Sequence, residues 1–461
     1  MNDEIIDKQR ININNIDNNF PEIKSSDRIV IFSPHPDDDV IANFGLTISA
    51  MKKNAAVKIV YMTNGDGRPK SYLDDYLKLN NITNFKGNIG EIRHAEALNG
   101  LHILGLNDND CIFLGYPDSA MKNLFLDNWD YDNLFKNKNL PNSYDHSPYT
   151  FSFEKKAPYC GMNVVKNLNQ ILNDFKPNII LTPDPTDDHG DHWATNAFVQ
   201  YVTVEKGYNK SMYHFLIHKE GLPIICAYCP CEDVIIPLNI SVFDAKWMKL
   251  PLSDDDKQLK RKAINSHESQ IYEIEERNYL ESFIRINEYF TVYPKIKIQK
   301  IPNYSLKHGM PKSSFKNVVF KPDDLKNIYD PLEKLLQRDL DSIGLIIDNQ
   351  SLYSIVKSNK NTDDYHYIFH LYLYDGKKYK KLDIDVKDDN ARYISNTSDN
   401  IIYPQKLEVQ HENDMIGVKI PLNIIKGTKN ILIAVDIQYS LDYSMNTTPL
   451  RVFEINIKLI F

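Results

Sequence analysis

Apolar runs and segments of helical period alternate over the first 300 residues of the chain. Four short apolar runs predict strands, and three longer segments between them have the spacing of helices. Strands that alternate with helices favour a parallel sheet with helices on both faces. We therefore predict an α/β domain with a Rossmann-like, mostly parallel sheet over residues 27–300. The predicted strands are 28–34, 57–65, 111–118 and 178–185, and the predicted helices are 40–53, 89–105 and 164–175.

The remaining regions differ in composition and in hydrophobic period. Residues 1–26 are polar without a sustained period and predict an N-terminal lead-in. Residues 119–160 form a long irregular segment rich in Asn, Asp and aromatic residues, and such segments are usually functional or mobile. Residues 301–335 carry Pro, Lys, Ser and Gly and predict a connector. Over residues 336–461 the period is close to two, which predicts an all-β, sandwich-like domain.

The composition is that of an ordinary globular protein. The chain has 461 residues, of which 42% are hydrophobic and 25% charged, so fibrous, collagen-like and wholly disordered classes are excluded. The formal net charge is 54 − 62 = −8, which disfavours nonspecific attraction to nucleic acid or anionic membranes. We therefore expect small neutral or zwitterionic substrates and no nucleic-acid partner.

Cysteine usage and hydropathy bear on the location of the protein. Five cysteines are too few for a disulfide scaffold, and an odd number cannot pair completely within the chain, so a reducing compartment is expected. No run approaches the roughly 18 apolar residues of a membrane span. The first twenty residues lack the basic region and apolar block of a secretory signal. These features predict a cytoplasmic protein without membrane insertion, and they leave homo-oligomer formation open.

Ligand-type side chains gather directly after the first predicted strand. His35 and three consecutive aspartates, Asp37 to Asp39, lie between this strand and a predicted helix. Loops at the carboxyl ends of parallel strands are where open α/β sheets bind ligands. A divalent cation would relieve the repulsion among these carboxylates. The alternative is a solvated turn in which the aspartates cap the helix.

A second cluster favours the metal site over the solvated turn. Residues 186–192 read Thr-Asp-Asp-His-Gly-Asp-His and open a helix directly after the predicted strand 178–185. If this strand is parallel to the strand 28–34, both clusters emerge at the same edge of the sheet. Side chains from the two loops can then bind one ion.

Two histidines and one carboxylate around an open position form the ligand pattern of a catalytic zinc. We assign His35, Asp38 and His192 to this pattern. The same ligand types hold iron in non-haem oxygenases, so they do not identify the metal by themselves. Asp37 is adjacent to a ligand but is not needed as one, and it can act as the base for a bound water, as a hydrolase requires.

The sequence at this point resembles the LmbE-like or PIG-L family of zinc de-N-acetylases. The resemblance is carried by His35-Pro36-Asp37-Asp38 paired with His189-Gly190-Asp191-His192, and it covers about residues 27–275. Other family motifs follow in order. They are Thr63-Asn64-Gly65, Arg93 with Glu96, Gly115-Tyr116-Pro117-Asp118, and Lys262-Ala263 followed by His267, Ser269 and Gln270.

The resemblance implies a reaction. It implies a hydrolase that removes the acetyl group from an N-acetylated amino sugar or sugar conjugate of the N-acetylglucosamine type, which is a small-molecule or oligosaccharide substrate. One catalytic zinc ion would be held by the three ligands assigned above. Asp37 would be the general base, and a protonated His189 would stabilise the oxyanion or protonate the leaving amine.

The resemblance also implies roles for residues around the ion. Arg93 and Asp118 would bind the substrate, and Asp191 would fix the orientation of a ligating histidine. The sequence departs from the family pattern at Asp39, where Glu is usual, at Gly190, where Pro is common, and over 119–160. The last departure leaves the identity of the sugar open.

Several alternatives remain open at this stage. A glycan-binding protein could keep the metal site without turnover, and a zinc amidase could cleave a different acyl amide. The aromatic residues of 119–160 could stack on sugars or pack their own loop. Three cysteines could bind a second metal with nearby histidines, although buried free thiols are the favoured interpretation. The side chains in question are Cys226, Cys229 and Cys231, with His214 and His218.

Overall fold

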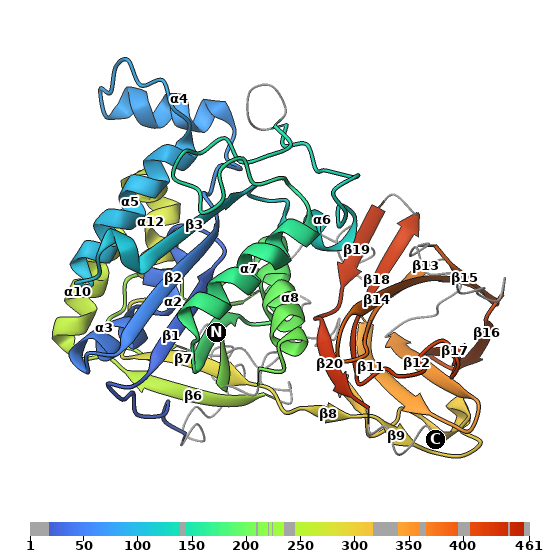
Figure 1. Ribbon diagram of the computed structural model, residues 1–461. Coiled ribbons are helices and arrows are strands. Elements are labelled where there is room, and N and C mark those ends of the chain that lie inside the picture. The colour runs from blue at the N-terminus through green and yellow to red at the C-terminus, as the bar shows by residue number, and fades with distance from the viewer. Residues whose placement is uncertain are drawn as a thin grey trace, which may run out of the picture. The chain divides into compact units, whose positions relative to one another are not determined.

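The chain divides into two compact units in a computed structural model (Figure 1). The change from the first unit to the second falls between Val292 and Tyr293, and the second unit also takes two short earlier segments, Val204–Gly207 and Leu238–Ala245. Parts of the predicted lead-in and connector lie outside the described residues. The structure describes residues 18–138, 144–208, 211–219, 221–223, 225–234, 245–316, 340–358, 366–394, 406–440 and 443–455.

The first unit contains a mainly parallel sheet. Its strand order is β3-β2-β1-β4-β5-β7-β6, and the first five of these strands are parallel to their neighbours. Strands β7 and β6 extend the sheet with antiparallel pairing, which the apolar pattern did not predict. The strands are β1 (Arg28–Ser33), β2 (Ala56–Thr63), β3 (Cys111–Tyr116), β4 (Ile179–Pro183), β5 (Ser211–Phe215), β6 (Lys246–Pro251) and β7 (Asn287–Val292).

Helices follow most of the parallel strands, as the alternation predicts. The predicted helix 40–53 is divided at Asn43, whose backbone leaves the helical region. Helices α4 and α6 were not predicted, and α6 lies within the irregular segment 119–160. The helices of this unit are α2 (Asp38–Ala42), α3 (Phe44–Lys52), α4 (Lys70–Leu79), α5 (Ile89–Ile103), α6 (Met121–Leu126), α7 (Gly161–Phe175), α8 (Gly190–Glu205), α10 (Asp254–Asn265), α11 (Glu268–Ile271) and α12 (Ile274–Glu281).

The central strands of this sheet are buried on both faces. Ile29 and Ile31 of β1 belong to a large apolar cluster that also contains side chains of α3, α5 and α10. The alternate residues Val30 and Phe32 are also fully buried. Burial of both alternating sets explains why these strands read as continuous apolar runs rather than as a period of two. A mixed α/β unit with a mainly parallel sheet is therefore confirmed.

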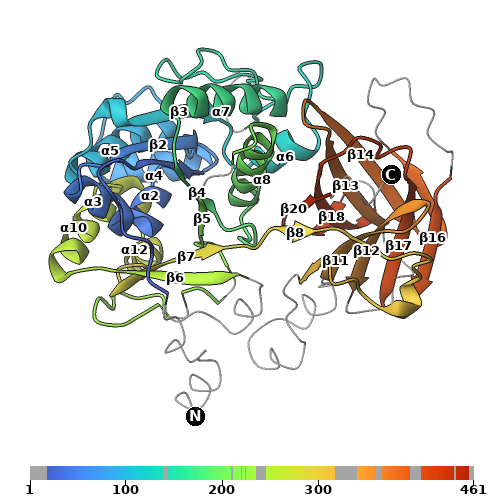
Figure 2. The same cartoon turned by 60° about the horizontal axis from the view of Figure 1, so that its bottom comes forward.

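The second unit consists of largely antiparallel sheets (Figure 2). One sheet has the order β10-β11-β12-β17-β16, with β9 paired to β11, and the other has the order β15-β14-β13-β18-β20-β8, with β19 paired to β18. The strands are β8 (Ile296–Lys297), β9 (Gln299–Lys300), β10 (Ser314–Lys316), β11 (Leu340–Ile347), β12 (Ser351–Ser358), β13 (His366–Tyr374), β14 (Tyr379–Lys387), β15 (Asn390–Tyr393), β16 (Glu408–Glu412), β17 (Met415–Pro421), β18 (Asn430–Ser440), β19 (Tyr443–Thr447) and β20 (Arg451–Glu454).

One apolar core joins the two sheets of the second unit. The cluster contains Leu345 and Val418 from one sheet and Phe369 and Ile433 from the other. Phe369, Leu371 and Leu373 lie at every second position of β13 and all belong to this core, so the period of two marks the side of the strand that faces it. Among the described residues of both units, none of the helices is long and apolar enough to cross a bilayer.

Candidate active site

Two loops that are distant in sequence meet at one edge of the parallel sheet. β1 ends at Ser33 and the following loop carries His35, while β4 ends at Pro183 and the following loop leads into α8 with His192. β1 and β4 are parallel neighbours, so both loops leave the sheet at the carboxyl ends of its strands. The ring centroids of His35 and His192 lie 5.3 Å apart. The predicted convergence of the two clusters is therefore present.

Four side chains at this edge could share one metal ion. They are His35, Asp38, His192 and His218, and one ligand atom from each lies within 4.8 Å of the others. Three of them are the residues assigned from the sequence. His218, which follows β5, was considered only as a partner of the cysteines. β5 is the parallel neighbour of β4, so His218 lies at the same edge of the sheet as the other three side chains.

The donor set fits a divalent metal such as zinc. Three imidazoles and one carboxylate are nitrogen and oxygen ligands of the kind that zinc accepts. His192 is fully buried, with carboxylate oxygens of Asp187 and Asp38 at 3.1 Å and 3.3 Å from its two ring nitrogens. Neither contact has the alignment of a hydrogen bond, so both buried nitrogens lack a hydrogen-bond partner. Such atoms are costly to bury unless another partner, such as an ion, engages them.

The electrostatics of the cluster favour positive charge at its centre. Burial opposes ionisation of His192, but Asp187 and Asp38 raise its pKa to about 9. Burial likewise opposes ionisation of Asp38, but the two imidazoles of His192 and His35 hold its pKa well below the usual value. These carboxylates hold protons on the imidazoles, and a cation would compete with those protons for the same position.

His189 is close to the cluster but is neutral. Its ring lies 4.8 Å from that of His35 and 5.1 Å from that of His218. Burial, together with the neighbouring imidazoles, lowers the pKa of His189 to about 3. The backbone N–H of Asp191 donates to its Nδ1 at 3.2 Å, so the ring proton is on Nε2. The neighbouring imidazoles therefore oppose a second proton on His189, whereas the resemblance implies a protonated ring during the reaction.

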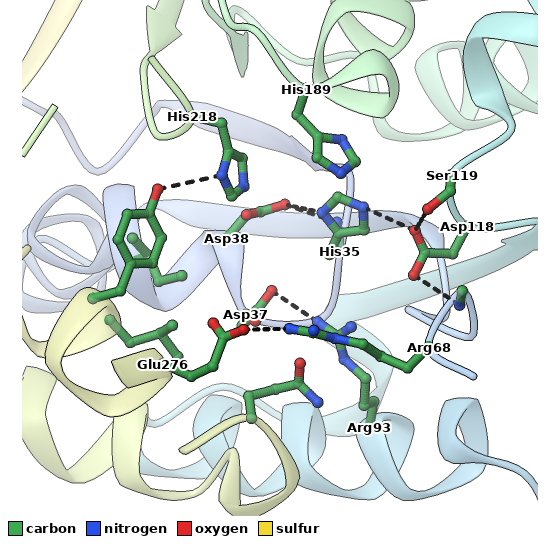
Figure 3. A pocket seen from close by; sticks show the side chains of 15 residues that line it. His35, Asp37, Asp38, Arg68, Arg93, Asp118, Ser119, His189, His218 and Glu276 are labelled. Atoms are coloured by element: carbon green, nitrogen blue, oxygen red, sulfur yellow. Dashed lines mark hydrogen bonds and ion pairs between the residues drawn. The ribbon is translucent and has the colours of Figure 1, made fainter. Parts of the chain in front are cut away.

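Asp37 is held by the predicted substrate-binding residue Arg93. Nη2 of Arg93 lies 3.1 Å from Oδ1 of Asp37, and Nη1 donates to the carbonyl oxygen of Gly65 at 3.2 Å (Figure 3). Gly65 has a φ of +65°, and a Cβ there would lie 2.2 Å from Nη1 of Arg93. Glycine at this position therefore leaves room for the guanidinium. Both Arg93 and Asp37 line the pocket described below.

Two further carboxylates contact the outer nitrogen of His35. Nε2 of His35 lies 3.4 Å from Oδ1 of Asp118 and 3.3 Å from Oδ2 of Asp191. Asp191 also accepts the backbone N–H groups of Ser119 and Met121 at 2.6 Å and 3.0 Å. Asp191 therefore joins the start of α8, the loop after β3 and the imidazole of His35. The structure places it against a ligand-type histidine, as the prediction for Asp191 requires.

Asp187 makes the corresponding contacts on the other side of the cluster. Its Oδ2 lies 3.1 Å from Nδ1 of His192 and accepts the backbone N–H groups of Ile217 and His218 at 3.2 Å and 3.1 Å. Burial opposes its ionisation, but His192 lowers the pKa of Asp187 to about 2. The sequence analysis gave Asp187 no role, because aspartates in such loops are usually turn formers.

A pocket of about 420 Å³ opens beside the cluster, which is within the size range of small-molecule sites. Figure 3 shows Asp37 and Asp38 between the histidines on one side and Arg93 on the other. Arg68 and Glu276 also line the pocket, and Nη2 of Arg68 lies 2.7 Å from Oε1 of Glu276. This pair joins the loop after β2 to α12. The sequence analysis did not identify either residue.

The remaining family motifs also meet next to the pocket. Glu96 of α5 accepts the backbone N–H and the hydroxyl of Ser269 at 2.6 Å and 2.7 Å, and the adjacent Gln270 lines the pocket. His267 is fully buried, and burial lowers its pKa to about 4. These contacts fix α11 against α5, so motifs separated by about 170 residues form one wall.

Two alternatives from the sequence can be compared with the structure. Within the described part of the chain, two groups of side chains could hold a metal ion, and neither contains a cysteine. They are the four side chains named above and a second group of His35, His189 and Asp191. Cys226, Cys229 and Cys231 are free thiols. Cys226 and Cys231 are exposed and Cys229 is half-buried, so the expectation of buried thiols is wrong for all three. The described aromatic residues of 119–160 pack within the segment and against α5, since Trp129 contacts Phe125 and Phe151 stacks on His94. None of them lines the pocket.

The fold and the site define an α/β protein with a candidate metal centre at the carboxyl ends of parallel strands. Residues 30–203 match the family model described as PIG-L: GlcNAc-PI de-N-acetylase. This match lies within the first unit of the chain and confirms the resemblance seen in the sequence motifs.

Solved structures with similar folds include proteins with deacetylase names. The A40926 pseudoaglycone deacetylase Dbv21 is 13% identical, with a TM-score of 0.37, over 57% of this chain and 96% of that chain. A deacetylase in the biosynthesis pathway of teicoplanin is 18% identical, with a TM-score of 0.35, over 53% and 85%. The N,N'-diacetylchitobiose deacetylase from Pyrococcus horikoshii is 18% identical, with a TM-score of 0.34, over 58% and 84%.

These values are too low to support an argument about the substrate of this chain. No curated protein matches the sequence. The family match and the geometry of the site therefore carry the functional argument.

Proposed function

We propose that the first unit is a metal-dependent hydrolase that removes the acetyl group from an N-acetylated amino sugar or sugar conjugate of the N-acetylglucosamine type. The observation that carries this proposal is the convergence of His35, Asp38 and His192 within 4.8 Å, beside the carboxylate of Asp37. The match to a de-N-acetylase family over residues 30–203 supplies the reaction type.

The proposed metal is one zinc ion held by His35, Asp38 and His192. When bound there, zinc would polarise the acetamide carbonyl and lower the pKa of a water molecule toward about 7. Asp191 and Asp187 would orient His35 and His192 through the contacts described above. Carboxylates that contact ligating histidines in this way commonly fix the ring orientation and increase the affinity for the metal.

Asp37 is the proposed general base. It lies in the pocket next to the ligand Asp38, and Arg93 holds its carboxylate in a defined orientation. Asp37 would accept a proton from the attacking water and return it to the departing nitrogen, so that acetate and a free amine result.

His189 is the proposed oxyanion donor. Its Nδ1 accepts a backbone hydrogen bond, so Nε2 carries the proton and can donate to the developing negative charge without a cationic ring. A neutral imidazole performs such a role in other enzymes when its pKa is lowered. The chemistry predicted for His189 is thus retained with a different protonation state.

The substrate would enter the pocket of about 420 Å³. Asp118 lines this pocket and, with Arg93, remains the proposed contact for sugar hydroxyls or an anionic substituent. Both side chains already have partners, since Asp118 accepts the backbone N–H of Gly67 at 2.9 Å and Arg93 contacts Asp37. They would therefore contact the substrate with their remaining hydrogen-bonding capacity.

The finer architecture is also part of this proposal. The strand order 3-2-1-4-5 of the parallel strands is that of Rossmann-like folds, with helices on both faces of the sheet. The apolar core shared by two sheets supports a β-sandwich for the second unit. We propose a deacetylase domain over residues 27–300 and an accessory domain over 336–461, with a lead-in over 1–26 and a connector over 301–335. The short strands β8, β9 and β10 lie before residue 336 but pair with strands of the accessory domain.

Acetate release from a panel of N-acetyl hexosamines tests the function. The zinc-loaded protein is expected to release acetate from at least one of them, and the chelated protein from none. Release of a longer acyl group but not acetate would show an amidase of different specificity. Binding of the sugars without any release would show an inert glycan-binding protein, and either result would contradict the proposal.

A further inference from the structure

We propose that His218 is a fourth metal-facing side chain of this centre, with its Nε2 lone pair directed at the ion and its ring held by Tyr279. This inference rests on the proposed function, because it concerns the same metal site. Neither the motifs of the sequence nor the assigned ligands include His218 or Tyr279.

Proximity is the first argument. One ring nitrogen of His218 lies within 4.8 Å of ligand atoms of His35, Asp38 and His192. The ring centroids of His218 and His192 are 4.7 Å apart, and Figure 3 shows the imidazole of His218 directed toward the carboxylate of Asp38. His218 also lines the pocket. A fourth nitrogen donor is therefore within reach of an ion that the other three side chains bind.

The backbone of His218 is fixed to the same loop that carries His192. Its N–H donates to Oδ2 of Asp187 at 3.1 Å, and its carbonyl oxygen accepts the N–H of Asp188 at 2.6 Å. The same Oδ2 of Asp187 lies 3.1 Å from Nδ1 of His192. One carboxylate thus sets the position of both histidines, and little reorganisation is needed for them to bind one ion.

The hydrogen bonds of Tyr279 select the tautomer of His218. The hydroxyl of Tyr279 donates to the carbonyl oxygen of Ile217 at 3.1 Å, and its oxygen lies 3.2 Å from Nδ1 of His218. A tyrosine hydroxyl has one proton, and a carbonyl oxygen can only accept. Once that proton is donated to Ile217, the tyrosine oxygen accepts from Nδ1–H of His218. The Nε2 atom then carries the lone pair that a metal requires.

A fourth protein ligand has a consequence for coordination. Catalytic zinc sites keep one position for water or substrate, whereas four protein ligands close a tetrahedral shell. His218 would therefore increase both the metal affinity and the coordination number of the ion, with water or substrate as a fifth ligand, which catalytic zinc can accept. Removal of its imidazole is expected to have the opposite effects on both.

Metal binding to the full-length chain tests the inference without an activity measurement. Co²⁺ is added to the metal-free wild type and to His218→Ala, Tyr279→Phe and His102→Ala. His102 is the control, because its side chain is 53% exposed and contacts Asp108. Affinity is measured by chelator competition, and the visible absorption of bound Co²⁺ reports its ligands.

We expect His218→Ala to lower the affinity at least about tenfold and to change the Co²⁺ spectrum. Tyr279→Phe should lower the affinity less, and His102→Ala should not change it. If His218→Ala does not fold, as judged by its thermal transition, His218→Gln replaces it. Wild-type affinity and spectrum in the His218 and Tyr279 variants would overturn the inference and leave the proposed function intact. Failure of the wild type to bind any metal would instead overturn the proposed function.

Discussion

Each unit of the molecule contains a cluster of histidine and carboxylate side chains, and the two clusters differ in the backbone that carries them. In the first unit, His35, Asp38 and His192 come from loops and helix starts at the ends of parallel strands, and their ligand atoms converge within 4.8 Å. In the second unit, His370 and Asp383 lie on adjacent strands as direct partners in the β13–β14 register. Convergence occurs only in the first cluster.

The strand-borne cluster places a different carboxylate at each ring nitrogen of His370, and the contact at Nε2 lacks the alignment of a hydrogen bond. Nδ1 of His370 lies 2.8 Å from Oδ1 of Asp383, and Nε2 lies 3.5 Å from Oδ2 of Asp436. All three residues are buried. Each ring nitrogen has its own carboxylate on opposite sides of the imidazole, so no common point is left for an ion. Residue types alone therefore do not predict a metal site, whereas loops at the carboxyl ends of strands allow several donors to face one point.

The largest difference between the two clusters is expected in metal content. His192→Ala should lose the bound ion, because it removes a buried ligand of the only assigned centre, while His370→Ala should keep one ion per chain. Metal analysis of both purified variants after zinc loading and dialysis checks this. Equal metal content in the two variants would remove the distinction between the clusters.

Substitution of residues beside the first cluster that are not metal ligands should lower turnover without changing the metal content. Asp37→Ala is expected to lower the rate of acetate release about 100- to 10,000-fold, since it removes the general base, and to keep one metal ion per chain. Steady-state rates and metal analysis on the same sample check both parts. His189→Ala should behave in the same way. Unchanged deacetylation in Asp37→Ala would refute the proposed role.

Loss of a carboxylate from the second cluster should affect stability and not turnover. Asp383→Asn is expected to lower the free energy of unfolding of the second unit by about 1–3 kcal/mol, because a buried partner of His370 loses its charge. Urea unfolding, followed with acetate release on the same preparation, measures both. Asp389→Asn is the control, since that side chain is 90% exposed. Similar unfolding curves for the two variants would contradict a stabilising role.

A substitution of Asp187 tests how far metal binding depends on a residue that orients the ligands without being a ligand itself. Asp187→Asn should weaken zinc binding about 10- to 100-fold, because the carboxylate that orients His192 and the backbone of His218 is neutralised. Chelator competition measures the affinity. Wild-type affinity in this variant would show that the ligands hold their orientation without it.

The smallest expected effect is the pH dependence of the second unit. Burial opposes ionisation of His370, but Asp383 and Asp436 raise its pKa to about 9, above the ordinary value of 6.5. A raised histidine pKa contributes stability that is complete below pH 6.5 and is lost as the pH rises through 9. Unfolding free energies between pH 6 and pH 10 should therefore fall in the wild type and be flatter in His370→Ala. Parallel curves would exclude this contribution.

Much of the fold and of the first cluster could be predicted because the signals are local. Continuous apolar runs marked β1 and β4, and the motifs that follow them contain His35, Asp38 and His192 within a few residues. The antiparallel strands β6 and β7 could not be predicted, because their sequences, KWMKLP and NEYFTV, mix polar and apolar residues and form no continuous apolar run. They become visible only in their pairing with each other and with β5.

His218 and Tyr279 could not be assigned for a different reason. Their approach to the site depends on the pairing of β5 with β4 and on the position of α12, and the sequence near them carries no motif. The nearby cysteines offered a local explanation for His218 that the structure does not support. The neutral state of His189 also depends on distant neighbours, since three histidines from separate segments surround it.

The hydrogen bonds from the backbone of Ser119 and Met121 to Asp191 limit which parts of the segment 119–160 can vary among related proteins. The first residues of the segment 119–160 are tied to the imidazole of His35 through Asp191. Changes of specificity within this segment are therefore expected to leave these first residues in place, so that the chemistry beside His35 is unaltered.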